Sequence, residues 1–170
     1  MNETADNNPT LMVVDDDEDC RVLLSDVLER EGYQVIAASD GVEAQRIALE
    51  NTPQLILMDV GMPDIDGLSA LWRIRDYPEL AEVPVLIVTA YDSYDLRAEA
   101  ASVGCQGYVT KPIDLDELKM LVDLCLRTGG KPDACCGSEL VDSELAEGNN
   151  LDSHPGSTRT ARVQLRNHVG

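Results

Sequence analysis

LILMDVGMPDIDG, residues 55–67, joins a short apolar run to an acidic turn. The run Leu55–Met58 is apolar at every position instead of alternating, which is typical of a strand covered by helices on both faces. Asp59 follows the run directly, and Pro63 and Gly67 behind it are turn-forming residues. The stretch therefore predicts a buried strand of a parallel sheet with a carboxylate at its carboxyl end.

Four similar apolar runs flank this stretch, and amphipathic segments separate them. This alternation indicates repeating βα units around a parallel sheet. We expect five such units in one compact, doubly wound α/β domain. The expected strands are residues 11–14, 33–38, 55–58, 85–88 and 107–110; among the expected helices are 68–77, ended by Pro78, and 94–103, ended by Gly104.

Charge limits the partners of the chain. The net charge of the 170 residues is -19, and residues 1–128 alone carry 26 acidic and 9 basic side chains. Such an acidic body repels nucleic acid and anionic membranes, so neither is an expected partner. No apolar run approaches the roughly 18 residues of a membrane span, and the polar N-terminus lacks the features of a signal peptide. The expected compartment is the cytoplasm.

Composition divides the chain into three parts. Residues 1–8 are expected to form a flexible N-terminal segment, and residues 9–128 hold the five βα units. From 129 to 170 Gly, Ser, Asn, Asp and Pro prevail, which is typical of a mostly disordered acidic and polar tail. No DNA-binding, cyclase or kinase domain is expected after the sheet, so output would pass through a partner.

Polar side chains follow four of the expected strands where each strand ends. Asp15 and Asp16 follow the first, Asp59 the third, Thr89 ends the fourth, and Lys111 follows the fifth. Ligands gather beyond the carboxyl ends of strands in open parallel sheets, so these groups are expected to share one site. Crowded carboxylates repel one another, and a hard cation removes the conflict. Oxygen-only ligands favour Mg²⁺, with Mn²⁺ as a substitute.

Phosphoryl transfer is the chemistry that this combination favours. With the cation present, the Asp59 carboxylate can attack phosphorus and form an aspartyl phosphate. The Lys111 ammonium and the Thr89 hydroxyl can then stabilise the charge on the transferring group. Each residue alone has an ordinary structural explanation, such as a helix cap or a strand end. Their joint placement at strand ends favours a functional site.

Four segments of the chain resemble, in order, the signatures of response-regulator receiver domains. LMVVDDDED (11–19) resembles the acid pocket, and LILMDVGMPDIDG resembles the phosphoacceptor strand and its turn. VLIVTAY (85–91) and GYVTKP (107–112) resemble the fourth and fifth strands. The resemblance covers about residues 9–128. It implies a flavodoxin-like fold, a five-stranded parallel sheet in order 2-1-3-4-5 with five helices, in a stand-alone receiver with a C-terminal tail.

The resemblance implies a metal-binding group of residues around the phosphoacceptor. Asp59 would be both the phosphoacceptor and a metal ligand. Asp16 would be a direct ligand, whereas Asp15 would act mainly through a water. Gly61 would lend its backbone carbonyl to the metal, so the lack of a side chain should not impair metal binding.

The resemblance also implies residues that hold the phosphoryl group. Thr89 and the Ala90 backbone amide would bind phosphoryl oxygens, and Lys111 would pair with the phosphate. The peptide bond before Pro112 would be cis, as in the family.

Two tyrosines would set the response and its duration. Tyr108 matches the family's aromatic switch position and would move into the space that Thr89 vacates on phosphorylation. The surface of the fourth helix, the fifth strand and the fifth helix would then change, because the helix at 94–103 has only a thin apolar face. Tyr91 is bulky, and we expect it to obstruct the attacking water and lengthen the lifetime of the phosphoryl group.

The resemblance implies a phosphorylation-dependent signalling switch of a two-component system or phosphorelay. The phosphodonor would be a histidine kinase or a histidine phosphotransfer protein, and a downstream protein would read the changed surface. The chain would be a monomer or a phosphorylation-dependent dimer. It would not turn over an external substrate.

Three alternatives have weaker support. A phosphatase of the haloacid dehalogenase type needs a second aspartate two residues after the nucleophile, where Gly61 stands. A nucleotide-binding module needs a glycine-rich phosphate loop, and neither GxxxxGK[ST] nor GxGxxG occurs. A degenerate receiver acting as a constitutive interaction module would lack site residues, whereas each position holds a competent residue.

Overall fold

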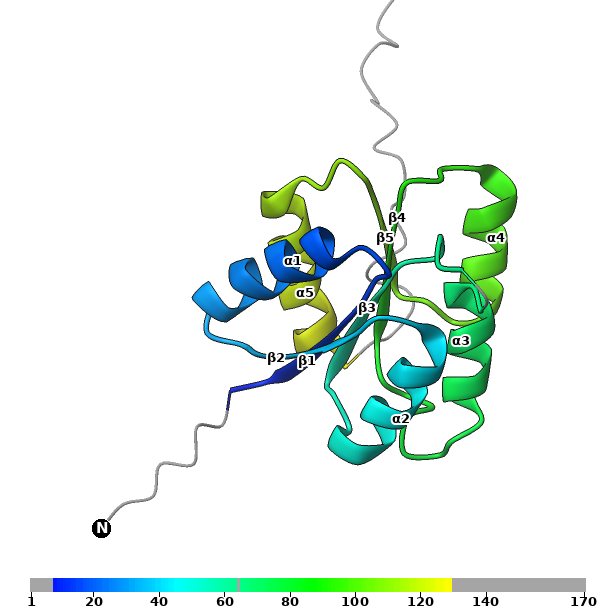
Figure 1. Cartoon of the computed structure of the whole chain (residues 1–170), viewed down its shortest axis with the longest axis horizontal. Coiled ribbons are helices and arrows are strands. Elements are labelled where there is room, and N and C mark those ends of the chain that lie inside the picture. The colour runs from blue at the N-terminus through cyan, green and yellow to red at the C-terminus, as the bar shows by residue number, and fades with distance from the viewer. Residues whose placement is uncertain (1–7, 64, 130–170) are drawn as a thin grey trace, which may run out of the picture. The chain divides into compact units, whose positions relative to one another are not determined.

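The computed structural model describes residues 8–63 and 65–129. All but the last position of the segment predicted to be flexible at 1–8 lies outside the described residues. The same holds for the predicted tail at 129–170, of which only Gly129 is described. Within the described part, five strands alternate with five helices (Figure 1). This alternation confirms the predicted order of βα units.

All five strands belong to one parallel sheet. They are β1 (Thr10–Val14), β2 (Gln34–Ala38), β3 (Leu55–Met58), β4 (Val85–Thr89) and β5 (Gly107–Thr110). The order across the sheet is β2-β1-β3-β4-β5, and every neighbouring pair is parallel. The direction of winding reverses between β1 and β3, which places a ligand-binding crevice at their carboxyl ends. The predicted doubly wound, flavodoxin-like fold is confirmed.

The helices begin behind side chains that cap their first turns. They are α1 (Glu18–Arg30), α2 (Gly41–Asn51), α3 (Gly67–Arg75), α4 (Tyr94–Ser102) and α5 (Leu115–Thr128). The N-cap side chains, each of which accepts a backbone N–H, are Asp17, Asp40, Asp66, Ser93 and Asp114. In the described part of the chain, no helix has the length and apolar character that crossing a membrane requires.

The end of the third helix is the predicted boundary that differs most from the structure, since the other expected ends differ by at most one residue. The third helix was expected to reach Tyr77, but α3 ends at Arg75. Two backbone hydrogen bonds turn the chain beyond that point. The Tyr77 N–H donates to the Ile74 carbonyl at 3.2 Å, and the Leu80 N–H donates to the Tyr77 carbonyl at 2.9 Å. Local turn bonds therefore replace the last helical residues before Pro78.

Helices cover both faces of the sheet. In Figure 1, α1 and α5 lie on one face, and α2, α3 and α4 lie on the other. Successive side chains of β1 divide between the two layers: Leu11 and Val13 pack into the core of the first face, and Met12 and Val14 into that of the second. Burial on both faces is the physical reason that the strands are apolar throughout.

The helix α4 has little apolar contact with the sheet. Ala100 is its only fully buried residue, and Leu96 is half-buried. By contrast, α5 buries Leu118, Leu121, Val122 and Cys125. The predicted thin apolar face of α4 is confirmed, and this helix should be the easiest of the five to displace.

The start of α3 lies directly against the carboxyl end of β3. A Cβ atom on Gly67 would lie 2.1 Å from the backbone carbonyl oxygen of Asp59 and 3.0 Å from the Met58 side chain. The Gly67 N–H donates to the Val60 carbonyl at 3.3 Å. Only glycine permits this close approach, so Gly67 fixes the path of the loop that carries Asp59.

We predict that Gly67→Ala destabilises the fold by about 1–3 kcal/mol, because the added methyl group collides with rigid backbone. Urea unfolding followed by circular dichroism measures this change. The matched control is Gly61→Ala, whose Cβ would lie 3.3 Å from the exposed Tyr91 ring and 3.5 Å from Asp59 Oδ1, with no backbone atom among its nearest neighbours. Equal stability of Gly67→Ala and wild type would contradict the prediction.

Candidate functional site

The register of the sheet aligns the ends of the strands that carry polar residues. Val14 lies opposite Met58 in neighbouring strands, so Asp15 and Asp59 follow at the same level. The Asp59 N–H donates to the Val14 carbonyl at 2.8 Å. At the carboxyl ends of β4 and β5, along the same edge, the Lys111 N–H donates to the Thr89 carbonyl at 2.8 Å. Main-chain pairing therefore positions the acids, the hydroxyl and the amine at one edge.

Lys111 connects the two buried acids of this edge. Its Nζ lies 2.6 Å from Asp15 Oδ2 and 2.9 Å from Asp59 Oδ2. The two carboxylate side chains are only 2% and 8% exposed, so this is a buried ion triad. Burial lowers the pKa of Lys111, but its hydrogen bonds and charge attraction to both carboxylates outweigh this effect, and the net pKa is raised. The ammonium therefore stays charged at neutral pH.

Asp16 completes a cluster of three carboxylates. Asp15, Asp16 and Asp59 each offer an oxygen atom within 4.8 Å of the others. Asp16 is exposed, whereas the other two are buried, so the cluster opens to solvent on the Asp16 side. Three carboxylates with one ammonium leave an excess of negative charge, which favours a divalent cation. The all-oxygen donor set fits a hard ion such as Mg²⁺.

Local hydrogen bonds orient the carboxylates. Asp15 Oδ1 accepts the Asp17 N–H at 2.9 Å, and Asp59 Oδ1 accepts the Gly61 N–H at 2.9 Å. These bonds leave Oδ2 of each carboxylate directed to Lys111. Gly61 thus contacts Asp59 through its backbone N–H. The predicted role of its backbone carbonyl as a metal ligand stays a prediction.

The Thr89 hydroxyl is fully buried at the end of β4. Its Oγ1 accepts the Tyr91 N–H at 3.2 Å, while Ala90 between them is exposed. The Tyr91 ring extends over the loop after β3, since a Cβ atom on Gly61 would lie 3.3 Å from its Cε2 atom. With 66% of its surface exposed, Tyr91 borders the site without closing it.

Tyr108 is half-buried on β5 and contacts two residues of the region after β4. Its hydroxyl donates to the Tyr91 carbonyl. The Arg97 guanidinium lies over its ring, 4.8 Å from the centroid. Burial raises the pKa of the Tyr108 phenol, so it remains protonated and able to donate.

Several neighbours of the site were not predicted from the sequence. Arg97 over Tyr108 is one, and Arg21 is another, because its Nη1 donates to the Asp15 carbonyl at 2.7 Å. Burial, followed by the hydrogen bond and charge of Asp15, raises the pKa of the Cys20 thiol to about 12, so this thiol stays protonated. The only sequence signal for Arg21 and Cys20 is their place in the first turns after the acid pair.

The remaining residues of the β3–α3 connection have structural roles. Asp66 caps α3, Met62 is buried and Ile65 is half-buried. Asp64 lies outside the described residues. The Lys111–Pro112 peptide bond is cis, the isomer expected from the resemblance.

Comparison with known proteins agrees with the fold. The family model described as the response regulator receiver domain matches residues 11–123. Sporulation initiation phosphotransferase F of Bacillus subtilis is 35% identical over 66% of this chain and 89% of that protein. Polar-differentiation response regulator DivK of Brucella anthropi is 36% identical over 62% of this chain and 86% of that protein.

Some relatives are longer. The DNA-binding dual master transcriptional regulator RpaA of Synechocystis is 34% identical over 79% of this chain, and the chain spans 56% of its length. Among solved structures, a putative response regulator from Chloroflexus aurantiacus has a TM-score of 0.68 and 32% identity, and the match covers 71% of this chain and 99% of that one. The chain therefore belongs to the response regulator receiver family.

Proposed function

We propose that the chain is a phosphorylation-dependent switch of a two-component system or phosphorelay, with Asp59 as the phosphoacceptor. The receiver would extend over residues 9–128. The observation that carries this proposal is the buried contact of Lys111 with both Asp15 and Asp59, beside the exposed carboxylate of Asp16. A histidine kinase or a histidine phosphotransfer protein would supply the phosphoryl group, and a downstream protein would respond to it.

An Asp59 carboxylate oxygen would form a bond to phosphorus while the bond from phosphorus to the imidazole nitrogen of the donor breaks. That nitrogen would keep the electron pair and take a proton from solvent, so the transfer needs no proton donor in this chain. Lys111 would pair with a phosphoryl oxygen, and the contact of its ammonium with Asp59 Oδ2 supports this role. The Thr89 hydroxyl and the Ala90 backbone amide, at the end of β4, would bind the other oxygens.

A divalent cation fits beside Asp59. Asp15, Asp16 and Asp59 would hold it together with the Gly61 carbonyl, and Asp15 would act mainly through a water. A bound Mg²⁺ supplies positive charge that offsets the carboxylates and the phosphoryl oxygens. Without it, a dianionic phosphoryl group would approach three carboxylates against only one ammonium. We therefore expect phosphorylation to depend on Mg²⁺ or Mn²⁺.

The phosphoryl group would change the surface around α4, β5 and α5. It adds roughly -1.5 to -2 charges and three acceptor oxygens to a small site. Thr89 would move toward these oxygens, and Tyr108 would follow into the vacated space. The chain would hold and lose its own phosphoryl group without turning over an external substrate.

We predict that the wild-type chain gains one phosphoryl group on incubation with acetyl phosphate and Mg²⁺, as measured by intact mass. Asp59→Asn should gain none, because an amide does not attack phosphorus, and EDTA should abolish the gain in wild type. Circular dichroism of the variant checks that it folds. The same mass gain in Asp59→Asn would exclude Asp59 as the acceptor.

We further predict that Tyr91→Ala loses its phosphoryl group several-fold faster than wild type. The ring borders the site over Gly61, and we expect it to obstruct the water that attacks phosphorus opposite the bond to Asp59. The measurement is the decay of phosphorylated protein after removal of acetyl phosphate. Tyr94→Ala is the matched control, since Tyr94 is also exposed, at 85%, and lies three residues further along. The idea fails if Tyr91→Ala decays no faster than wild type.

A further inference from the structure

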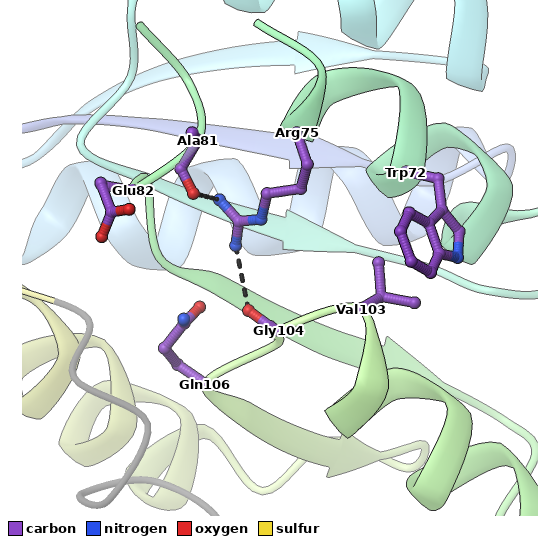
Figure 2. A pocket seen from close by; sticks show the side chains of 7 residues that line it. All are labelled: Trp72, Arg75, Ala81, Glu82, Val103, Gly104 and Gln106. Atoms are coloured by element: carbon purple, nitrogen blue, oxygen red, sulfur yellow. Dashed lines mark hydrogen bonds between the residues drawn. The ribbon is translucent and has the colours of Figure 1, made fainter. Parts of the chain in front are cut away.

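A half-buried arginine, Arg75, holds the C-terminal end of α4. The Nη1 atom of Arg75 donates to the carbonyls of Leu80, Ala81 and Val83 at 3.0, 2.9 and 2.6 Å. Its Nη2 atom donates to the carbonyl of Gly104 at 3.0 Å, just beyond α4. Figure 2 shows the guanidinium between the Ala81 and Gly104 carbonyls, on one wall of a pocket of about 350 Å³. One side chain thus connects the α3–β4 loop to the α4–β5 turn.

These four hydrogen bonds should keep the Gly104 end of α4 in place. Partial burial lowers the pKa of Arg75, the charge of Glu82 opposes this effect, and in the described part of the chain no carboxylate lies within ion-pair distance of the guanidinium. Backbone carbonyls are therefore its hydrogen-bond partners, and moving the Gly104 carbonyl away would break a hydrogen bond to a charged, half-buried group. The adjoining Val103 is also buried. The C-terminal end of α4 is therefore the fixed end.

The N-terminal end of α4 is held by exposed contacts instead. Arg97 forms a two-bond ion pair with Asp92, with Nε–Oδ1 at 2.7 Å and Nη2–Oδ2 at 3.0 Å. The same guanidinium lies over the Tyr108 ring. About half of the surface of each ion-pair side chain is exposed, so these contacts should be weaker than the four hydrogen bonds of the half-buried Arg75. Arg97 is nevertheless the cationic side chain of α4 that contacts β5.

We propose that Arg97 is a positioning residue that couples Tyr108 to α4, so that α4 pivots about its clamped C-terminal end. A shift of the Tyr108 ring removes the surface on which Arg97 rests. The first turns of α4 then move or loosen, whereas Arg75 keeps the Gly104 end in place. Since Ala100 is the only fully buried residue of α4, little apolar packing opposes this pivot. The proposal rests on the proposed function for its trigger, but its contacts exist without phosphate.

The coupling is tested first in the unphosphorylated chain by hydrogen–deuterium exchange and mass spectrometry. Arg97→Ala and Tyr108→Leu should each raise exchange of the amides at 94–99 about two- to fivefold, the range expected for an exposed cation–π contact. The double variant should change exchange by less than the sum of the two single changes, because the Arg97–Tyr108 contact that they share can be lost only once. Arg97→Ala also loses the pair with Asp92, and Tyr108→Leu also loses the bond to the Tyr91 carbonyl. Arg97→Lys should fall between Arg97→Ala and wild type, since it keeps the charge without the planar stack.

The pivot is tested with acetyl phosphate and Mg²⁺ on the same variants. Phosphorylated wild type should change exchange at 94–99 and leave 101–106 near its starting value. Arg97→Ala should still gain one phosphoryl group but lose most of the response at 94–99. Glu99→Ala, which changes another exposed charge of α4, is the matched control and should respond like wild type.

The outcomes separate the two proposals. Additive effects of Arg97→Ala and Tyr108→Leu, or a full response in phosphorylated Arg97→Ala, would overturn the coupling. An equal response at 101–106 would overturn the fixed end. A wild-type chain that gains no phosphoryl group would instead count against the proposed function, and the exchange data without phosphate would still decide the role of Arg97.

Discussion

The balance of charge around the Lys111 ammonium is the constraint on which the site depends. Asp15 and Asp59 are buried at the ends of adjacent parallel strands, where the register leaves them no freedom to separate. Their repulsion would be costly in a medium that water does not screen, and Lys111 contacts both carboxylates. One positive charge does not balance three carboxylates, so the cluster remains suited to a divalent cation. That cation would in turn offset the negative charge of a phosphoryl group. Structural stability and the proposed phosphoryl chemistry thus use the same residues.

Much of this arrangement could be predicted from the sequence because it follows from strand pattern. The run Leu55–Met58 predicted a buried strand, and a polar residue directly behind each such run must lie at the carboxyl edge. The contacts of Arg75 and Arg97 could not be predicted in this way, because each joins elements that are distant in sequence or depends on a particular side-chain conformation. The end of α3 was missed for a related reason. Pro78 sets only the furthest point that the helix could reach, and hydrogen bonds of the turn around Tyr77 end it earlier.

The two ends of α4 differ in what holds them, and this difference links the site to the surface. At one end, Arg75 is half-buried and donates hydrogen bonds to four carbonyls. At the other, Arg97 is exposed and rests on Tyr108, whose hydroxyl bonds to the carbonyl of Tyr91, two residues after Thr89. A path of direct contacts therefore leads from the buried hydroxyl of the site to a helix with one buried residue. A shift along this path can move α4 while the core stays in place, because most residues of the two apolar layers come from the strands and the other helices.

Divalent-cation binding is the decisive measurement for this site, because the proposed phosphoryl chemistry requires a cation held by the acidic cluster. Free Mn²⁺ has an electron paramagnetic resonance signal that is lost on binding, and a titration measures stoichiometry and affinity together. We expect one Mn²⁺ per chain, displaced by Mg²⁺, with an affinity that falls on the order of tenfold or more in Asp16→Asn. Asp19→Asn, an exposed acid of the same helix start outside the cluster, should bind as wild type does. Equal affinity in wild type and Asp16→Asn, or an equal loss in both variants, would contradict a site built from these three carboxylates.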